Sequence, residues 1–198
     1  MEHLARACAQ GQVPACVVGV VCNRADAPGL ARAQALDLPA HLLPHAGFDS
    51  REAYDQALAR LLEGLAPDLI VLAGFMRILS PGFVRQFSGR LVNIHPSLLP
   101  AFPGTRTHER AIAAGVLVHG ATVHLVTEAL DQGPILAQAV VRVWPGDDAD
   151  RLAARVLSAE HALYCRAVRW LLEDRVTVQA DRVVVEGVDP ADRLVMNP

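Results

Sequence analysis

The segment 91–100, LVNIHPSLLP, ends an apolar run with two polar side chains that could act on a carbonyl group. Asn93 and His95 are two residues apart, so in a strand their side chains point to the same side. Pro96 ends the strand, because proline cannot continue a central strand. A carboxamide and an imidazole can both donate hydrogen bonds to an oxygen that becomes negative when a carbonyl is attacked. The same pattern is also typical of an asparagine that caps a strand and a structural histidine at the sheet edge.

Asp131 lies in the segment EALDQGP and is the second candidate. An aspartate before a Gly-Pro turn commonly serves the turn itself. If the loop folds over the sheet edge, Asp131 can instead pair with His95 and favour the charged imidazolium. It can then accept a proton from an attacking amine, directly or through water. The residues alone leave both interpretations open.

The segment GFMRILSP supplies apolar side chains just beyond the end of another apolar run. A flat heterocycle could lie against this surface while backbone groups bind its edge. The alternative is that these residues only close the top of the core.

The elements that must position these residues alternate between strands and helices. Three apolar runs without alternation are typical of strands in a parallel sheet that is covered on both faces, at residues 16–21, 69–75 and 91–94. Helical spacing separates them, after Pro28 as far as residue 36 and from about residue 51 to residue 65. Asp49 and Glu52 fit a capping box at the start of the second helix. We therefore expect an α/β fold with a Rossmann-like, mostly parallel sheet and helices on both faces.

The second half predicts a helix near 107–114 and strands at 121–126 and 135–143. A long helix follows from about 148 to 173, and runs at 176–179 and 183–185 predict a final hairpin. The chain opens on a helix-like segment rather than on a strand.

Composition favours one folded domain over residues 1–198. The chain has 198 residues, of which 52% are hydrophobic and 20% charged, so it can bury a sizeable core. The formal net charge of -3 provides no basic surface for nucleic acid. No apolar stretch reaches the ~18 residues of a membrane span, and the N-terminus is too short and polar for a signal peptide. These features predict a soluble cytoplasmic protein that binds neither nucleic acid nor membrane. We expect a monomer or homodimer, although no sequence feature decides between them.

Four segments together closely resemble the phosphoribosylglycinamide formyltransferase family: GFMRILSP, VNIHPSLLPAFPGTRTH, HGATVHLVTEALDQGPIL and ARVLSAEH. The resemblance runs from about residue 5 to the end of the long helix. It implies the formyltransferase fold, and the catalytic residues of that family match Asn93, His95 and Asp131. Glu160 matches a residue that holds the substrate's ribose hydroxyls. The implied contacts of the folate are Phe75, Met76, Arg77, Ile78, Leu79, Leu91, Asn93 and the loop before Asp131.

The resemblance also implies the reaction. The amine of glycinamide ribonucleotide would attack the formyl carbon of the co-substrate 10-formyltetrahydrofolate, in de novo purine biosynthesis. Asn93 and protonated His95 would bind the oxyanion. Asp131 would fix the imidazole and help to remove the proton of the attacking amine. No metal ion is expected to take part.

One departure from the family concerns the N-terminus. Family members begin with a strand and a glycine-rich loop that holds the substrate phosphate, and this chain starts just after that loop. We expect an N-terminally truncated domain in which the first strand and the phosphate loop are missing, with a hairpin and tail at 175–198. A start codon assigned too late would explain this, because losing a central strand would expose its two neighbours along their full length.

Three alternatives stay open. A related formyltransferase acting on methionyl-tRNA or an amino sugar usually carries a C-terminal domain. A formyltetrahydrofolate hydrolase normally carries an extra N-terminal domain. The third is a non-catalytic folate-binding homologue, which the missing strand makes plausible.

Overall fold

The computed structural model describes residues 1–179 and 182–197. Its helices are α1 (Glu2–Ala9), α2 (Pro28–Gln34), α3 (Arg51–Leu65), α4 (Pro81–Gln86), α5 (Thr107–Ala113) and α6 (Ala149–Leu172), with 3₁₀ turns at His45–Gly47 and Pro190–Arg193. Its strands are β1 (Val20–Cys22), β2 (Ala40–Leu42), β3 (Ile70–Leu72), β4 (Leu91–His95), β5 (Val118–Leu125), β6 (Ile135–Arg142), β7 (Val176–Gln179), β8 (Arg182–Val185) and β9 (Leu194–Asn197).

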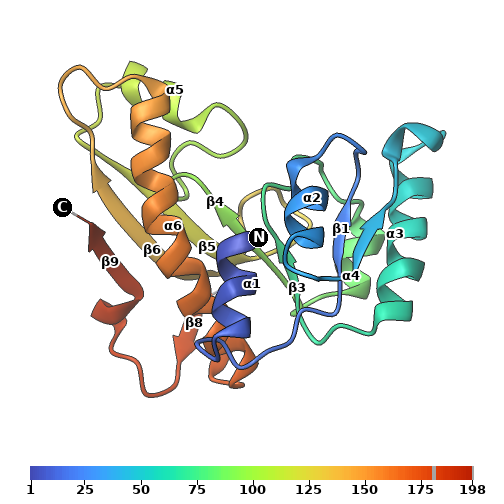
Figure 1. Ribbon diagram of the computed structural model, residues 1–198. Helices are drawn as coiled ribbons and strands as arrows, with labels where there is room; N and C mark the ends of the chain where they lie inside the picture. Colours follow the sequence, from blue (N-terminus) through green and yellow to red (C-terminus); the bar gives the residue numbers. More distant parts are fainter. Residues whose placement is uncertain (180–181, 198) are drawn as a thin grey trace.

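The main sheet has five strands in the order β3-β4-β5-β6-β9. The pairs β3–β4 and β6–β9 are parallel, whereas β5 is antiparallel to both β4 and β6. Four of the five strands therefore run in one direction and only β5 runs in the other. This arrangement, with α6 across one face (Figure 1), confirms the predicted α/β fold with a mostly parallel sheet.

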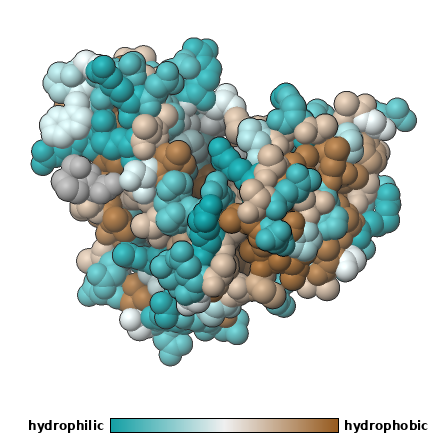
Figure 2. Space-filling view, viewed as in Figure 1, coloured by the Kyte–Doolittle hydropathy of each residue, from teal (hydrophilic) through white to brown (hydrophobic). Residues whose placement is uncertain are grey.

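A second, two-stranded sheet is formed by the parallel pair β1–β2. Among the described residues, β1 pairs only with β2 and β3 pairs only with β4, so each has one edge without a partner strand. All three residues of β1 and of β3 are only half-buried. Figure 2 shows apolar side chains at the surface of this part of the molecule, around α2, β1 and β3.

The predicted strands at 16–21 and 69–75 are wrong in length, because the observed ones cover only residues 20–22 and 70–72. An apolar run can remain extended, but it counts as a strand only where a neighbour accepts its hydrogen bonds. Each of these strands has a neighbour on one side only. The strand predicted at 91–94 is confirmed with one additional residue, His95.

The helices agree more closely with the sequence. The helix predicted at 51–65 is confirmed, but its cap is Ser50, whose hydroxyl accepts a hydrogen bond from the Ala53 amide at 3.0 Å. The predicted capping box of Asp49 and Glu52 is therefore wrong. The long helix begins after Asp148, whose carboxylate accepts from the Arg151 amide at 2.8 Å.

Two hydrophobic cores lie on opposite faces of the main sheet. On one face α6 contributes Leu152, Val156 and Leu163 to a cluster that also contains Val92 of β4. On the other face Leu91 of β4 packs with residues of α3 and α4. The alternation along β4 thus sends neighbouring residues into different cores.

Several elements were not predicted, namely β2, α4 and the C-terminal β9. The hairpin β7–β8 is confirmed, but the tail after it returns to the sheet as β9, parallel to β6. Within the described residues, none of the helices is long and apolar enough to cross a membrane.

Candidate active site

Strand β4 places Asn93 and His95 on the face of the sheet opposite α6. In the register between β4 and the antiparallel β5, Asn93 lies opposite His124 and His95 lies opposite Thr122. Side chains directly opposite each other share one face of a sheet. The side chains of these four residues therefore form a compact polar cluster at the end of β4. The His95, Thr122 and His124 side chains are buried, and that of Asn93 is half-buried.

Hydrogen bonds of the Thr122 hydroxyl hold the loop after β4 in place over His95. The Thr122 hydroxyl donates to the Ser97 carbonyl at 2.7 Å and accepts from the Leu99 amide at 3.0 Å. The returning loop brings the Phe102 carbonyl oxygen to 3.0 Å from Nε2 of His95. A carbonyl oxygen only accepts, so Nε2 of His95 carries a hydrogen.

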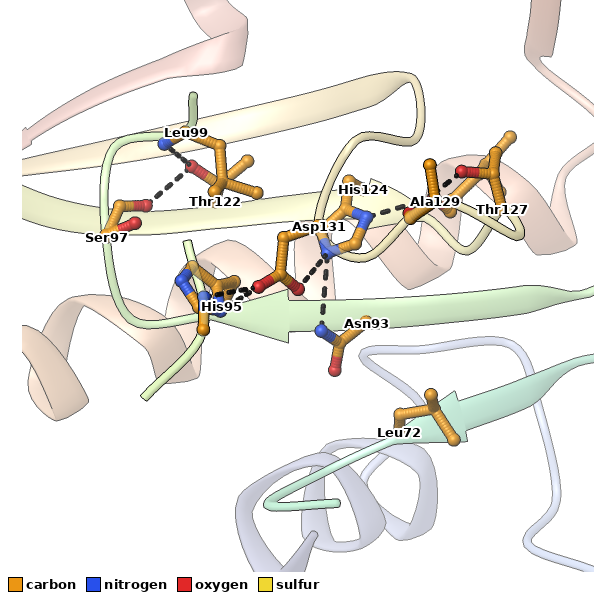
Figure 3. Close-up of polar contacts among 12 residues, drawn as sticks. Leu72, Asn93, His95, Ser97, Leu99, Thr122, His124, Thr127, Ala129 and Asp131 are labelled. Atoms are coloured by element: carbon orange, nitrogen blue, oxygen red, sulfur yellow. Dashed lines mark hydrogen bonds and ion pairs between the residues drawn. The ribbon is translucent and has the colours of Figure 1, made fainter. Parts of the chain in front are cut away.

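Asp131 comes from the loop between β5 and β6 and lies directly beside His95 (Figure 3). Its Oδ2 is 3.5 Å from Nδ1 of His95, and both side chains are 7% exposed. The same oxygen accepts a hydrogen bond from the Gly104 amide at 2.8 Å. The backbone of Asp131 is left-handed, with φ of 54°, which aspartate tolerates better than most residues. The loop thus folds over the sheet edge and does not leave Asp131 facing solvent.

This arrangement can stabilise negative charge and move protons. The Asn93 amide and the imidazole of His95 are adjacent donors on one face of the sheet, as an oxyanion requires. The Asp131 carboxylate can hold a hydrogen on Nδ1 of His95 and can take a proton from a nucleophile nearby. The structure therefore brings together the three residues that the sequence predicts to be catalytic.

The segment predicted to bind folate follows β3. Met76 is 77% exposed and Ile78 is 54% exposed, which leaves an apolar surface in solvent. Phe75 is half-buried against the core, and Leu79 is buried. Leu91 is fully buried in the core beneath them, so it supports this surface without being open to solvent itself.

Arg77 lies between the two exposed residues of this segment. Its guanidinium carbon is 4.8 Å from the centre of the Tyr54 ring, a cation–π contact. Its Nε is buried without a hydrogen-bond partner among the described residues. The Nε of Arg77 is thus an unsatisfied buried donor among the described residues.

Glu160 lies apart from the other predicted site residues. It belongs to α6, which covers the sheet face opposite Asn93, and no hydrogen bond joins it to Asn93, His95 or Asp131 in the described part of the chain. Burial raises the pKa of the Glu160 carboxyl above its usual value, and the nearby Met1 amine opposes the shift.

Sequence reasoning missed three residues that build the site: His124, Thr122 and Gly104. The first two were detectable, because in HGATVHL they are two residues apart and therefore share one face of the predicted strand. The role of Gly104 depends on how the loop folds back, which has no sequence signal.

An open cleft of about 600 Å³ borders the Asp131 loop, lined by residues that include Leu99, Pro103 and Leu130. It touches neither Asn93 nor His95, so it does not by itself mark the position of a substrate. Across the described residues, no group of three or more His, Cys, Asp and Glu side chains is placed to hold a metal ion.

Comparison with known proteins decides the family. Residues 1–168 match the formyl transferase family. The chain belongs to this family. A phosphoribosylglycinamide formyltransferase of Escherichia coli (strain K12) is 44% identical over 187 residues, which are 94% of this chain and 88% of the relative.

Solved structures agree with this assignment. The glycinamide ribonucleotide transformylase 1 of Symbiobacterium toebii superimposes on this formyl transferase with a TM-score of 0.91 at 41% identity, covering 93% of this chain and 87% of the other. A formyltetrahydrofolate deformylase of Pseudomonas syringae has a TM-score of 0.86 at 32% identity, covering 92% of this chain but only 60% of the other. The fold is thus shared by transferases and a deformylase.

Proposed function

We propose that this enzyme transfers the formyl group of 10-formyltetrahydrofolate to the amine of glycinamide ribonucleotide, as a step of purine biosynthesis. The observation that carries the proposal is the convergence of Asn93, His95 and Asp131 at the end of β4. Relatives named for this reaction, which match the chain over most of their own length, support glycinamide ribonucleotide as the acceptor.

In the proposed reaction the substrate amine attacks the formyl carbon and forms a carbon–nitrogen bond. The carbonyl electrons move to the oxygen, which becomes an oxyanion bound by Asn93 and His95. Asp131 takes the proton of the attacking amine, directly or through water. The tetrahedral intermediate collapses by breaking the bond to the folate nitrogen, which receives the proton.

In this step an N–H group of His95 has to become available to the oxyanion. Its Nε2 hydrogen is bonded to the Phe102 carbonyl in the structure, and its Nδ1 faces Asp131. The oxyanion therefore has to share the Nε2 hydrogen with Phe102 or replace that carbonyl.

The other parts of the proposal concern binding. The folate ring lies on the apolar surface of Met76 and Ile78, close to the free Nε of Arg77. Glu160 binds the ribose hydroxyls. A cytoplasmic location, a monomeric or homodimeric state and a reaction that uses no metal belong to the same proposal.

A formyltetrahydrofolate hydrolase is the second candidate, because a deformylase shares the fold. The relatives named phosphoribosylglycinamide formyltransferase, at 44% and 39% identity, favour the transferase. Folate binding without turnover is the third candidate, favoured by the open edges of β1 and β3.

One experiment separates the candidates. The protein is incubated with 10-formyltetrahydrofolate with and without glycinamide ribonucleotide, and both the released folate and the formylated product are measured. We expect turnover only with the acceptor. Folate release without the acceptor would identify a hydrolase, and binding without turnover would identify a non-catalytic protein.

A further inference from the structure

His124 makes two contacts that determine where its hydrogen lies. Its Nδ1 is 3.0 Å from the Leu125 carbonyl oxygen, and its Nε2 is 3.3 Å from Nδ2 of Asn93. The carbonyl oxygen can only accept, so Nδ1 is the donor. Figure 3 shows one ring nitrogen of His124 facing both Asn93 and Asp131.

Burial also favours the neutral form of the His124 ring. Burial lowers the pKa of His124, because the charged ring would lose its hydration, and the Leu125 carbonyl and the Asp131 carboxylate oppose the shift. A neutral ring with its hydrogen on Nδ1 has only a lone pair at Nε2. Nε2 must then accept, and the group of Asn93 that faces it must be the NH₂ group.

We propose that His124 is a positioning residue that fixes the Asn93 carboxamide with its NH₂ group toward the reacting carbonyl. The inference rests on the proposed function, in which Asn93 donates to the formyl oxygen. One hydrogen of the NH₂ group is bonded to His124, and the second remains for the oxyanion. Without the lone pair of His124 Nε2 to accept this hydrogen bond, the Asn93 carboxamide can rotate and present Oδ1, which would repel the negative oxygen.

The Asp131 loop also packs against the Leu125 carbonyl, which accepts the Nδ1 hydrogen of His124. A Cβ atom on Gly133 would lie 1.7 Å from the Leu125 carbonyl oxygen, so the loop packs directly against the acceptor of the Nδ1 hydrogen. The Leu125 amide in turn donates to the Pro134 carbonyl at 3.0 Å. The loop that carries Asp131 therefore also holds the carbonyl that orients His124.

A charged His124 would not serve this role. Its Nε2 would then carry a hydrogen that points at the NH₂ group of Asn93. With the NH₂ group of Asn93 facing the ring, this hydrogen would attract Oδ1 of Asp131, 3.9 Å away, and would pull the carboxylate, whose Oδ2 lies beside His95, toward His124. The neutral form is therefore the one that keeps both Asn93 and Asp131 in place.

The test compares His124→Gln, which keeps an acceptor oxygen near the position of Nε2, with His124→Phe, which keeps a ring but no acceptor. Each is made in the natural chain and in an Asn93→Ala background, and kcat and KM for formyl transfer are measured. We expect His124→Phe to lower kcat by about tenfold, the value of one hydrogen bond, with KM little changed. His124→Gln should recover most of this loss.

The Asn93→Ala background separates positioning from a general structural role. If His124 acts through Asn93, His124→Phe should have less than about a twofold effect once Asn93 is gone. Equal effects in both backgrounds, or a Gln variant no better than the Phe variant, would overturn the proposal.

A second measurement does not depend on the reaction. Nitrogen-15 NMR of the natural protein near neutral pH should show the Nδ1–H tautomer at one buried histidine, and this signal should vanish in His124→Gln. An Nε2–H or charged ring at this position would overturn the proposal even if the enzyme is fully active. Absence of formyl transfer in the natural chain would instead count against the proposed function, while the tautomer could still be read.

Discussion

The Asp131 carboxylate connects three segments that are far apart in sequence. Its Oδ2 contacts His95 of β4 and the Gly104 amide of the loop after β4, and its own loop packs on β5. The pairing with His95 is a partly electrostatic contact between buried groups, where screening by water is weak. The Asp131 side chain thus holds the imidazole of His95 and the loop that contains Gly104 next to each other.

Loss of either oxyanion donor should slow the reaction strongly. We expect Asn93→Ala and His95→Ala each to lower kcat by ~10²–10³, the effect typical of removing one such donor. Steady-state formyl transfer measures this, with the melting temperature as a check on folding. Turnover like that of the natural chain in either variant would remove that residue from the mechanism.

Asp131→Asn tests the charge of the carboxylate separately from its shape. The amide still offers an oxygen to the Gly104 amide, but it can neither balance a charged His95 nor accept a proton. We expect kcat to fall by ~10² or more, within the range of a general base, with folate affinity within about threefold. The matched control is Glu52→Gln at the start of α3, whose carboxylate forms an exposed ion pair with Arg51. This control should leave kcat unchanged.

The shared position of Asn93 and His95 could be predicted from the sequence, because alternation along one strand places both side chains on one face. The partner of Asn93 could not, since it depends on the register between β4 and β5, which side-chain types do not specify. The two hydrogen bonds of His95 to Phe102 and Asp131 depend on how two loops fold back, and no local pattern encodes that.

At the scale of the elements, the position of the Asp131 loop depends on Gly133. A side chain at this position would meet the Leu125 backbone at 1.7 Å, and a backbone atom cannot move aside as a flexible side chain can. We expect Gly133→Ala to lower the free energy of unfolding by about 1–3 kcal/mol, as overpacking does, and to reduce kcat by displacing Asp131. Urea unfolding and formyl transfer measure the two effects. Gly47→Ala, where the new atom would meet nothing within 4 Å, should change neither.

His119 of β5 is buried against His108 of α5, with the ring centres 5.2 Å apart, and neither of its ring nitrogens has a hydrogen-bond partner among the described residues. The pKa of His119 is lowered from 6.5 to about 4, mainly because the ring is buried and in part because of His108 and His95, while the Pro96 backbone opposes the shift. The folded protein therefore leaves this ring neutral in a range where the unfolded chain protonates it.

This difference makes stability depend on pH. Because the folded pKa is the lower one, the free energy of unfolding falls as the pH drops through the window from 6.5 to about 4, by at most about 3 kcal/mol. We expect His119→Leu to lose less stability between pH 7 and pH 5 than the natural chain, as measured by urea unfolding. His3→Gln, at an exposed position, is the control. An equal loss in His119→Leu would contradict the expectation.

Helices were predicted better than strands for a physical reason. The helix Arg51–Leu65 makes its own hydrogen bonds, so spacing and caps fix its length. The strands β1 and β3 depend on partners, and their apolar runs extend beyond the residues that find one. Strand β9 pairs with β6, more than 50 residues earlier in the chain, and no local signal indicates such a contact.

At the scale of the whole molecule, the split between the two sheets should be visible in hydrogen exchange. The amides of Val20 and Ile70 donate to Pro39 and Arg90 on the paired sides, so those of Val21 and Val71 point to the open edges. We expect Val21 and Val71 to exchange much faster than Val123 of β5, which has a strand on each side. Equal protection would mean that another segment covers these edges.

The separation of the two cores has a spectroscopic consequence. Both tryptophans of the chain lie outside the second core, since Trp170 is buried in the α6 cluster and Trp144 is exposed after β6. The aromatic residues of the second core are Tyr54 and phenylalanines. Indole fluorescence would therefore report a native signal even after α3 and α4 had come away from the sheet. A probe attached near Tyr54 is needed to observe the unfolding of that half of the protein, because the other tyrosine, Tyr164, lies in the α6 cluster.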